Sequence, residues 1–390
     1  MKLCDVTQFY APGSGGVKRY LLEKRRYVQE HTHDEHWLII PGEKTDWKSE
    51  GRLHTVTIRS PIVERRAGYR FLWNTRAVRR VIAQIQPDLI ESADPYQLGW
   101  ATQRVGRELK VPVVGFYHSH LPQLAKQTFR HFGNIVGNRL GRFAERYVRK
   151  LYNRFDQTIV ASETLAQELK ERGIQNVAVC PLGVDTKLFH PRAADPSVRE
   201  NFKVPAEVFL LLSVGRLSLE KNTRALLQGF EQLMQNPTLQ QPVYLLIVGT
   251  GPLQPEVVAL QQKYPNVRWQ MQVMPNQLAE LYCSADLFVH PGLQETFGLV
   301  MLEAQACGCP VLGINGSRLE ELCFTGKEWW ATSDAPEELA QAIQKVLTSR
   351  EVLRATGQAA AQVVQAQFSW KQAFDRLWKV YNTTVSRYKT

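Results

Sequence analysis

The chain has 390 residues, of which 44% are apolar and 22% charged, and a formal net charge of +11. This length exceeds what one ordinary core requires and indicates two domains, and the composition excludes a disordered or fibrous chain. Charges interrupt the N-terminal segment, and no apolar run approaches the roughly 18 residues that span a bilayer, so we expect neither a signal peptide nor a membrane-spanning helix.

The excess of positive over negative charge lies entirely in the first half of the chain. Residues 1–200 contain 32 Lys and Arg against 21 Asp and Glu, whereas residues 201–390 contain 16 of each. Such asymmetry favours an anionic partner of the N-terminal domain, either nucleic acid or an acidic membrane surface. The six cysteines form no zinc-type pairs, so we expect reduced thiols in a cytoplasmic protein.

Strand-like and helix-like segments alternate along the chain. The predicted strands are 3–9, 36–40, 54–58, 89–92, 113–117, 158–161 and 177–180 in the first half, and 208–214, 244–248, 267–271, 287–290 and 310–313 in the second. This alternation is typical of parallel sheets covered by helices and predicts an α/β fold. Prolines and small residues interrupt the pattern near 189–197, so we place one domain at 1–193 and a second at 194–368, followed by helix 369–390.

A glycine turn near the N-terminus has the composition of a ligand-binding loop. Gly15 and Gly16 precede a predicted helix, and glycine lets the backbone approach a phosphate closely. The segment is not Gly-x-Gly-x-x-Gly, which disfavours a nicotinamide cofactor.

Histidines gather in two places. His118 and His120 follow the strand 113–117, where an imidazole can contact a substrate or simply pack. The stretch 31–36 holds three histidines but no second ligand group, so we interpret it as a helix end running into a strand rather than a zinc site.

Two basic segments, 59–80 and 126–154, carry most of the excess charge and interleave it with aromatic residues. A basic face beside an aromatic stripe suits anionic lipid; alternatively, the apolar stripe packs into the domain and the arginines are solvated. Nucleic acid fits less well, because no recognised binding fold accompanies the charge. The candidate residues of an acceptor or membrane face are Tyr69, Arg70, His120, Arg139 and Arg142.

Arg216 and Lys221 follow the strand 208–214, at the carboxyl end of a parallel strand, where open α/β sheets bind ligands. Fixed cations at that position can neutralise an anionic leaving group, although Arg and Lys are more often solvated surface charges. The chain contains no Asp-x-Asp sequence, which counts against a diphosphate held through a metal ion. We therefore expect no metal and no other cofactor.

Glu295 and Glu303 are the most informative pair of residues. Glu295 lies in a loop after an apolar strand, and Glu303 lies on the second turn of the helix predicted to follow Gly298. The unpaired amides and the positive dipole end of that helix favour an anionic phosphate. Helix amides for phosphate and two carboxylates for hydroxyls together suit a sugar nucleotide.

The Glu-x7-Glu spacing resembles the motif of retaining glycosyltransferases of family 4, which have two facing Rossmann-like domains. Five further segments fit the same family in the same order, at 13–17, 116–120, 181–185, 214–222 and 248–252. The chain departs from the family after the strand 310–313, where many members have Gly-Gly-x-x-Glu and Glu320 or Glu321 would have to stand in.

The resemblance implies roles for individual residues. Arg216 and Lys221 would bind the diphosphate, Glu295 the hydroxyls of the donor sugar, Glu303 the ribose hydroxyls, and His118 the donor sugar. The helix 369–390 would cross back onto the first domain. The remaining donor-binding residues that it implies are Gly15, Gly16, Gly215, Gly249, Phe297, Gly298, Leu299 and Val300.

The hypothesis that follows is a retaining transfer of a hexose from a UDP- or GDP-sugar to a lipid hydroxyl, such as a diacylglycerol or phosphoinositide glycolipid, by a cytoplasmic enzyme peripheral to the inner face of the cell membrane. A second hypothesis keeps the chemistry but makes the acceptor a soluble sugar, lipopolysaccharide or exopolysaccharide. A third is an inactive nucleotide-sugar-binding or scaffold protein.

Overall fold

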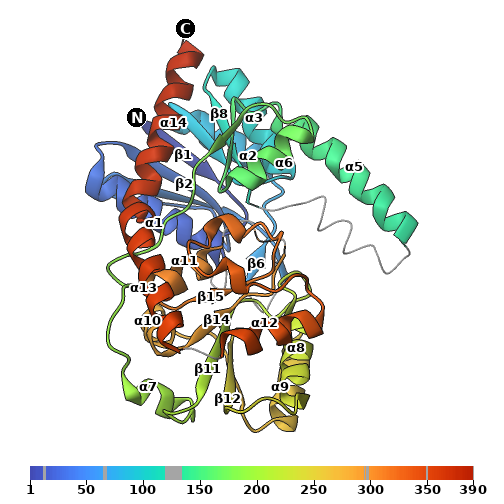
Figure 1. The fold of residues 1–390 in the computed structure, drawn as a ribbon. Helices are drawn as coiled ribbons and strands as arrows, with labels where there is room; N and C mark the ends of the chain where they lie inside the picture. Colours follow the sequence, from blue (N-terminus) through green and yellow to red (C-terminus); the bar gives the residue numbers. More distant parts are fainter. Residues whose placement is uncertain are drawn as a thin grey trace. The chain divides into compact units, whose positions relative to one another are not determined.

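The computed structural model describes residues 1–11, 15–64, 68–118, 134–293, 295, 298–347 and 350–389, with 134–138 described by their backbone alone (Figure 1). Two residues of the predicted site, His120 and Phe297, lie outside the described residues. The chain divides into two compact units, which we treat separately: unit 1 holds Met1–Leu182 and Lys371–Thr390, and unit 2 holds Gly183–Trp370.

Unit 1 is built on an eight-stranded sheet. Its central strands are buried along nearly their whole length, as expected for parallel strands covered on both faces. Only the last strand is antiparallel, and it is an exposed, charged edge. The strand order is β10 (Val177–Val179), β9 (Gln157–Val160), β8 (Val113–Phe116), β7 (Leu89–Ser92), β1 (Lys2–Val6), β2 (Glu35–Gly42), β4 (Leu53–Arg59) and β3 (Asp46–Glu50).

The helices of unit 1 bury apolar stripes against this sheet. In α2, Val78, Val81, Ile82 and Ile85 recur at helical spacing and are buried, and the Asn74 side chain caps the first turn by accepting the amide of Ala77. The helices are α1 (Gly16–His31), α2 (Thr75–Ile85), α3 (Gln97–Leu109), α5 (Asn134–Tyr152), α6 (Glu163–Glu171) and α14 (Trp370–Lys389). A short ribbon, β5 (Ile62–Glu64) with β6 (Tyr69–Arg70), precedes α2.

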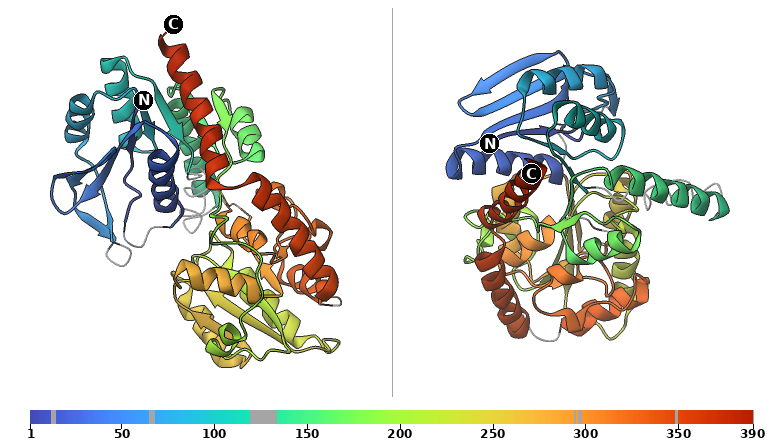
Figure 2. Two further views of the ribbon diagram at one scale, coloured as in Figure 1. Left: turned by 90° about the vertical axis from the view of Figure 1, so that its left-hand side faces the viewer. Right: turned by 90° about the horizontal axis from the view of Figure 1, so that it is seen from above.

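The C-terminal helix α14 lies beside α1, as the two views in Figure 2 show. Tyr27 of α1 packs its ring against Phe374 and Trp378, and its hydroxyl donates to Asp375 at 2.8 Å. Trp378 also donates its indole N–H to Asp34 at 2.6 Å. These contacts make α14 a part of unit 1 although it is the last element of the chain.

Unit 2 is built on a five-stranded sheet that is parallel throughout. Successive residues of its central strand pack alternately into two cores: Leu210 and Leu212 face one, and Phe209 and Leu211 the other. The strand order is β13 (Val267–Gln270), β12 (Val243–Val248), β11 (Phe209–Val214), β14 (Leu287–Val289) and β15 (Val311–Leu312). The two parallel sheets confirm the predicted α/β class.

Helices cover both faces of this second sheet. The helices are α7 (Pro196–Asn201), α8 (Thr223–Gln235), α9 (Gln254–Lys263), α10 (Pro275–Ser284), α11 (Leu299–Ala306), α12 (Pro336–Val346) and α13 (Arg350–Gln367), with 3-10 turns η2 (Glu320–Leu322) and η3 (Lys327–Trp329). Residues 183–193, which the sequence assigned to the first domain, belong to unit 2, since Val184 bridges to Ser369 and Phe189 lies in a core of unit 2.

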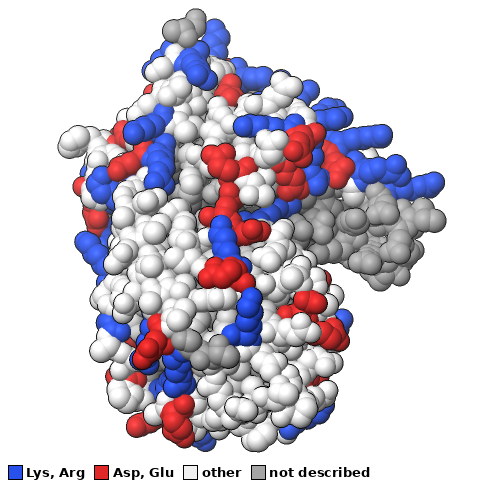
Figure 3. All heavy atoms as spheres, in the orientation of Figure 1, with Lys and Arg blue, Asp and Glu red and all other residues white. Residues whose placement is uncertain are grey.

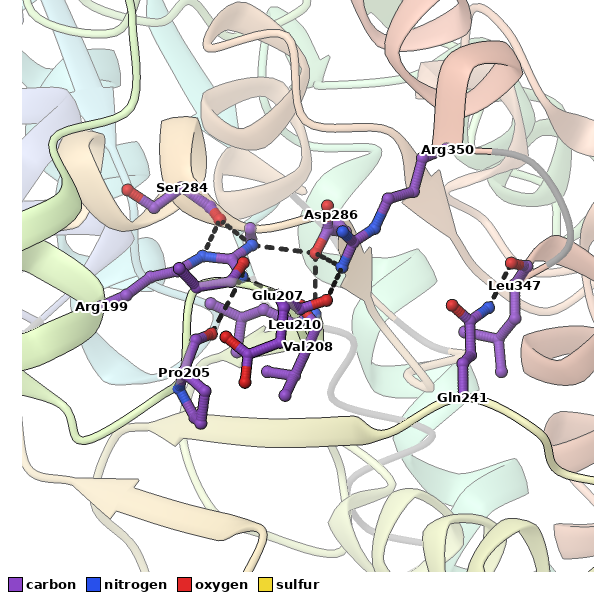
Figure 4. Close-up of polar contacts among 12 residues, drawn as sticks. Arg199, Pro205, Glu207, Val208, Leu210, Gln241, Ser284, Asp286, Leu347 and Arg350 are labelled. Atoms are coloured by element: carbon purple, nitrogen blue, oxygen red, sulfur yellow. Dashed lines mark hydrogen bonds and ion pairs between the residues drawn. The ribbon is translucent and has the colours of Figure 1, made fainter.

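Ionic contacts fasten the amino ends of β11 and β14 (Figure 4). Arg199 of α7 donates to Asp286 at 2.9 Å and to the carbonyl oxygen of Ser284 at 2.8 Å, while Asp286 accepts the amide of Leu210. Arg350, at the start of α13, approaches the same carboxylate at 3.4 Å. These charges stabilise the amino edge of the sheet. The opposite, carboxyl edge is the one at which open α/β sheets bind ligands.

Candidate functional site

The loops that follow the carboxyl ends of β11 and β14 bring together two residues of the predicted site, Lys221 and Glu295, whose pairing the sequence did not predict. These strands are neighbours in the sheet, so the loops that follow them meet. Lys221 forms an ion pair with Glu295, and His290, the first residue after β14, lies 3.6 Å from the same carboxylate through its Nε2. The side chain of Glu295 is only 10% exposed and that of Lys221 is 28% exposed, so the carboxylate is the more desolvated partner.

Burial alone would raise the pKa of the Glu295 carboxyl. The Lys221 ammonium and the His290 imidazole outweigh burial, and they hold the pKa of Glu295 well below its usual range. The carboxylate is therefore ionised at neutral pH and can accept hydrogen bonds from sugar hydroxyls.

Glycines let the neighbouring loops after β11 and β12 pack directly against one another. A Cβ atom on Gly249 would lie 1.9 Å from the carbonyl oxygen of Gly215, a distance that excludes every other residue. The amide of Gly215 donates to Val248 at 3.0 Å and that of Leu217 donates to Thr250. Backbone rather than side chains therefore forms this part of the edge, as a phosphate site requires.

Helix α11 begins at this edge and carries the second glutamate. Gly298 caps it in the left-handed conformation, with φ of 61°, and accepts the amides of Met301 and Leu302. The amides of Leu299 and Val300 lie in the first turn, where they have no intrahelical acceptor. Glu303 is 2% exposed, and the hydroxyl of Tyr282 lies 3.4 Å from its Oε2.

Two further residues named from the sequence, Arg216 and Glu320, have different surroundings. Arg216 follows β11 as predicted but is exposed. Glu320 accepts the amide of Gly316 at 2.8 Å, so it stabilises its own turn.

At the carboxyl edge of unit 1, His118 is buried directly after β8. Its ring stacks on Phe116, with centroids 4.2 Å apart, and meets the edge of Tyr20 at 5.6 Å. Burial, helped by the nearby Lys24 ammonium, lowers the pKa of His118 to about 3, so the imidazole is neutral near pH 7. Gly15 caps α1 and Gly16 is its first residue, which places both at a helix N-terminus.

A buried ionic cluster near His118 was not predicted from the sequence. Lys24 of α1 lies 2.9 Å from Asp5 of β1, 2.8 Å from Glu91 of β7 and 2.9 Å from the hydroxyl of Tyr381 on α14. His36 pairs with Asp5 at 2.9 Å and therefore belongs to this cluster, which gives one histidine of the stretch 31–36 a structural role. In the part of the chain that the structure describes, no group of three His, Cys, Asp or Glu residues could hold a metal ion.

Asp94 is a further buried ionisable residue that was not predicted from the sequence. It follows β7 and is 1% exposed, with the amide of Tyr96 donating to it at 2.7 Å. Burial raises the pKa of Asp94 to about 7, against the opposing effects of that amide and of Gln8. The sequence offered one weak signal, an acidic residue just after an apolar strand.

The residues predicted for the acceptor or membrane face lie in two different environments. Arg139 and Arg142 on α5 are exposed, as is Phe143 at 69%, and basic side chains gather over this helix in Figure 3. In contrast, Arg70 is bound to its own unit, through Glu43 at 2.7 Å and the carbonyl oxygen of Ser60, and Tyr69 is half-buried. No helix of the described ranges is long and apolar enough to cross a membrane.

Comparisons with known proteins now define the class. The model described as Glycosyltransferase Family 4 matches residues 14–188, and the one described as Glycosyl transferases group 1 matches residues 195–363. The GDP-mannose-dependent alpha-(1-6)-phosphatidylinositol dimannoside mannosyltransferase of Mycobacterium tuberculosis is 31% identical, covering 90% of this chain and 89% of its own. This protein is therefore a glycosyltransferase. It belongs to glycosyltransferase family 4, which confirms the resemblance drawn from the motifs.

More distant similarities extend to another relative and to solved structures. The alpha-monoglucosyldiacylglycerol synthase of Streptococcus pneumoniae is 26% identical over 68% of this chain and 60% of its own length. Among solved structures, the sucrose-phosphate synthase of Thermosynechococcus elongatus superposes with a TM-score of 0.79 at 20% identity, covering 99% of each chain. Anabaena HepE in complex with UDP-glucose gives a TM-score of 0.72 at 20% identity, over 98% of this chain and all of its own. Both structures have the same fold as this protein.

Proposed function

We propose that this enzyme transfers a hexose from a UDP- or GDP-sugar to a hydroxyl of a membrane-lipid acceptor, with retention of anomeric configuration. The observation that carries the proposal is the Lys221–Glu295 ion pair on the carboxyl edge of unit 2, next to the helix that carries Glu303. Relatives named for phosphatidylinositol and diacylglycerol glycolipids support a lipid acceptor such as a diacylglycerol or phosphoinositide glycolipid.

In this proposal the donor occupies the carboxyl edge of unit 2. Lys221 and Arg216 neutralise the diphosphate, together with the first amides of α11, and no metal ion takes part. Glu295 accepts hydroxyls of the sugar and Glu303 those of the ribose. Neutral His118 serves as a hydrogen-bonding group for the sugar or the developing oxocarbenium ion.

The exposed basic helix α5 supports a peripheral position on an anionic membrane, at the cytoplasmic face. Each Lys or Arg near such a surface contributes about 1 kcal/mol of attraction. Co-sedimentation with anionic vesicles should therefore be strong at low salt and weak at high salt. If the protein does not bind vesicles even at low salt, the acceptor is a soluble sugar or polysaccharide, the second candidate.

A panel of nucleotide sugars tests the donor, beginning with GDP-mannose because the relative at 31% identity is named for it. A donor at 100 times its dissociation constant should stabilise the folded protein by about 2.7 kcal/mol, which a melting curve detects easily. Hydrolysis or transfer should accompany the shift. If no UDP- or GDP-sugar shifts the melting temperature, the proposed function is wrong and a scaffold role becomes the better explanation.

A further inference from the structure

Two cysteines meet between α10 and α11, outside the groups used in the proposed reaction. Cys283 of α10 is half-buried, and Cys307, which caps the C-terminus of α11, is buried. The Cys283 sulfur lies 3.6 Å from the carbonyl oxygen of His190 and 3.8 Å from that of Cys307. Each of the six cysteines of the chain is a free thiol.

The two thiols differ in acidity because of where they lie. The Cys307 thiol donates a hydrogen bond to the Cys283 sulfur, and Arg192 lies beside it; these contacts outweigh burial and lower the pKa of Cys283 to about 7. The same hydrogen bond, together with burial, raises the pKa of Cys307 far above its usual range. With this pKa, the partly exposed Cys283 sulfur is in part a thiolate near neutral pH, and it lies beside the protonated Cys307 thiol; an attacking sulfur and its resolving partner have this arrangement.

The cysteine pair adjoins a contact that positions Glu303. Tyr282, the residue before Cys283, places its hydroxyl 3.4 Å from the Glu303 carboxylate. On α11, the amide of Cys307 donates to the carbonyl oxygen of Glu303 at 3.2 Å, so these residues are one turn apart. The Tyr282–Glu303 and Cys283–Cys307 contacts are therefore adjacent cross-links between the same two helices.

We propose that Cys283 is a site of oxidative modification by hydroperoxides, with Cys307 as its resolving thiol, and that the resulting disulfide alters how α11 presents Glu303. The effect on donor binding rests on the proposed function, whereas the modification itself does not.

The chemistry proceeds in two balanced steps. The Cys283 thiolate attacks the terminal oxygen of the hydroperoxide; the O–O bond breaks, sulfur loses two electrons, and the alkoxide leaves and takes a proton from water. This gives a sulfenic acid at Cys283 and an alcohol. The Cys307 sulfur then attacks the sulfenic sulfur; the S–S bond forms, the S–O bond breaks, and the thiol proton leaves with the hydroxide as water.

Closing the disulfide must move the helix ends. The sulfurs of a disulfide are about 2.05 Å apart, well inside the contact distance of two thiols, and its torsion prefers values near ±90°. Because the Tyr282–Glu303 contact is next to this bond, the movement reaches the carboxylate proposed to bind ribose. We expect the KM for the donor to rise at least threefold on oxidation and to recover fully with a dithiol reductant.

The experiment treats the full-length protein with hydrogen peroxide and maps its peptides without reduction. We expect one linkage, Cys283 to Cys307. In Cys307→Ser, which lacks the resolving sulfur, dimedone should label Cys283. The control is Cys323→Ser, which removes another buried thiol of unit 2 and should leave the linkage intact.

Peptide mapping gives a result even if no donor is turned over, so the modification can be judged apart from the proposed function. Unmodified thiols at peroxide concentrations that oxidise free cysteine, or a linkage from Cys283 to Cys309 instead, would overturn the proposed site. A Cys283–Cys307 disulfide that leaves the donor KM unchanged in an active enzyme would overturn its effect on Glu303.

Discussion

The ion pair of Lys221 with Glu295 brings two residues of the proposed donor site into contact. The Glu295 side chain is 10% exposed and that of Lys221 28%, so the lysine offsets much of the cost of burying the carboxylate. In the proposed function, a diphosphate that approaches Lys221 would take over part of this attraction and leave the Glu295 carboxylate available to sugar hydroxyls. The ion pair holds Lys221 and Glu295 together at the carboxyl edge of unit 2.

Replacing Lys221 by Met tests this role. The substitution removes the cation proposed for the leaving diphosphate and leaves Glu295 buried without its closest partner, so the transfer rate should fall by roughly 10²- to 10³-fold. Initial rates at saturating donor measure this. The matched control is Lys263→Met, which removes an exposed cation of the same unit that pairs with Glu231, and it should keep full activity. Near-normal turnover in a folded Lys221→Met protein contradicts the assignment.

Asp94 gives a second residue-scale prediction, in stability rather than activity. The unfolded chain releases this proton near pH 3.8 and the folded protein near pH 7, so the folded state holds more protons between these values. Stability therefore falls as pH rises through this window. Asp94→Asn removes the titration and keeps an oxygen for the amide of Tyr96, so it should exceed the wild type at pH 8 by on the order of 2 kcal/mol.

Urea unfolding at pH 5, 6, 7 and 8 measures this difference for Asp94→Asn and for the exposed control Glu43→Gln. The control should run parallel to the wild type across the series. If the Asp94→Asn difference is the same at every pH, the carboxyl group does not titrate as the structure implies.

At the scale of elements, apolar runs predicted most of the strands and the glycine before α11 predicted its start. The strand β3 was not predicted, because Asp46–Glu50 is a charged, exposed edge strand. The turn before β4 determines its pairing with that strand. From the sequence, Lys221 and Glu295 could be placed only in two loops at the same edge of a sheet. Their contact depends on which strands are neighbours, and long-range packing sets that order. The same holds for Asp94, whose pKa depends on burial that no local pattern reports.

The glycine contact between the loops after β11 and β12 gives a prediction at this scale. Gly249→Ala places a methyl group against the carbonyl of Gly215 and must push the two loops apart. In contrast, Gly316→Ala, at a φ of 74°, meets open space and incurs only the cost of the left-handed backbone. We expect the control to lose about 1 kcal/mol and Gly249→Ala to lose more than 2 kcal/mol. Donor affinity should fall in Gly249→Ala alone, as measured by calorimetry; equal losses in both variants would mean that the contact is unimportant.

At the scale of the whole molecule, each unit has its own sheet and cores, and the chain returns to unit 1 at its end. The buried Lys24 cluster is one of the contacts that fix this return, because it joins α1, β1 and β7 to Tyr381 of α14 across most of the sequence. The family resemblance predicted the return of the last helix but not this cluster. Contacts between residues so far apart leave no periodic signal in a single sequence.

The last prediction concerns the stability of unit 1. Lys24→Met would leave the carboxylates of Asp5 and Glu91 buried without their shared cation, and breaking a buried pair in this way costs about 3–5 kcal/mol. Since the two units have separate cores, the loss should lower the unfolding transition of unit 1 while that of unit 2 stays in place. Adding Glu91→Gln should recover part of the lost stability, because it removes one of the two buried carboxylates that have no cation. Hydrogen exchange resolved by peptide separates the units. Uniform loss of protection in both, or none in either, would mean that the cluster does not hold α14 in place.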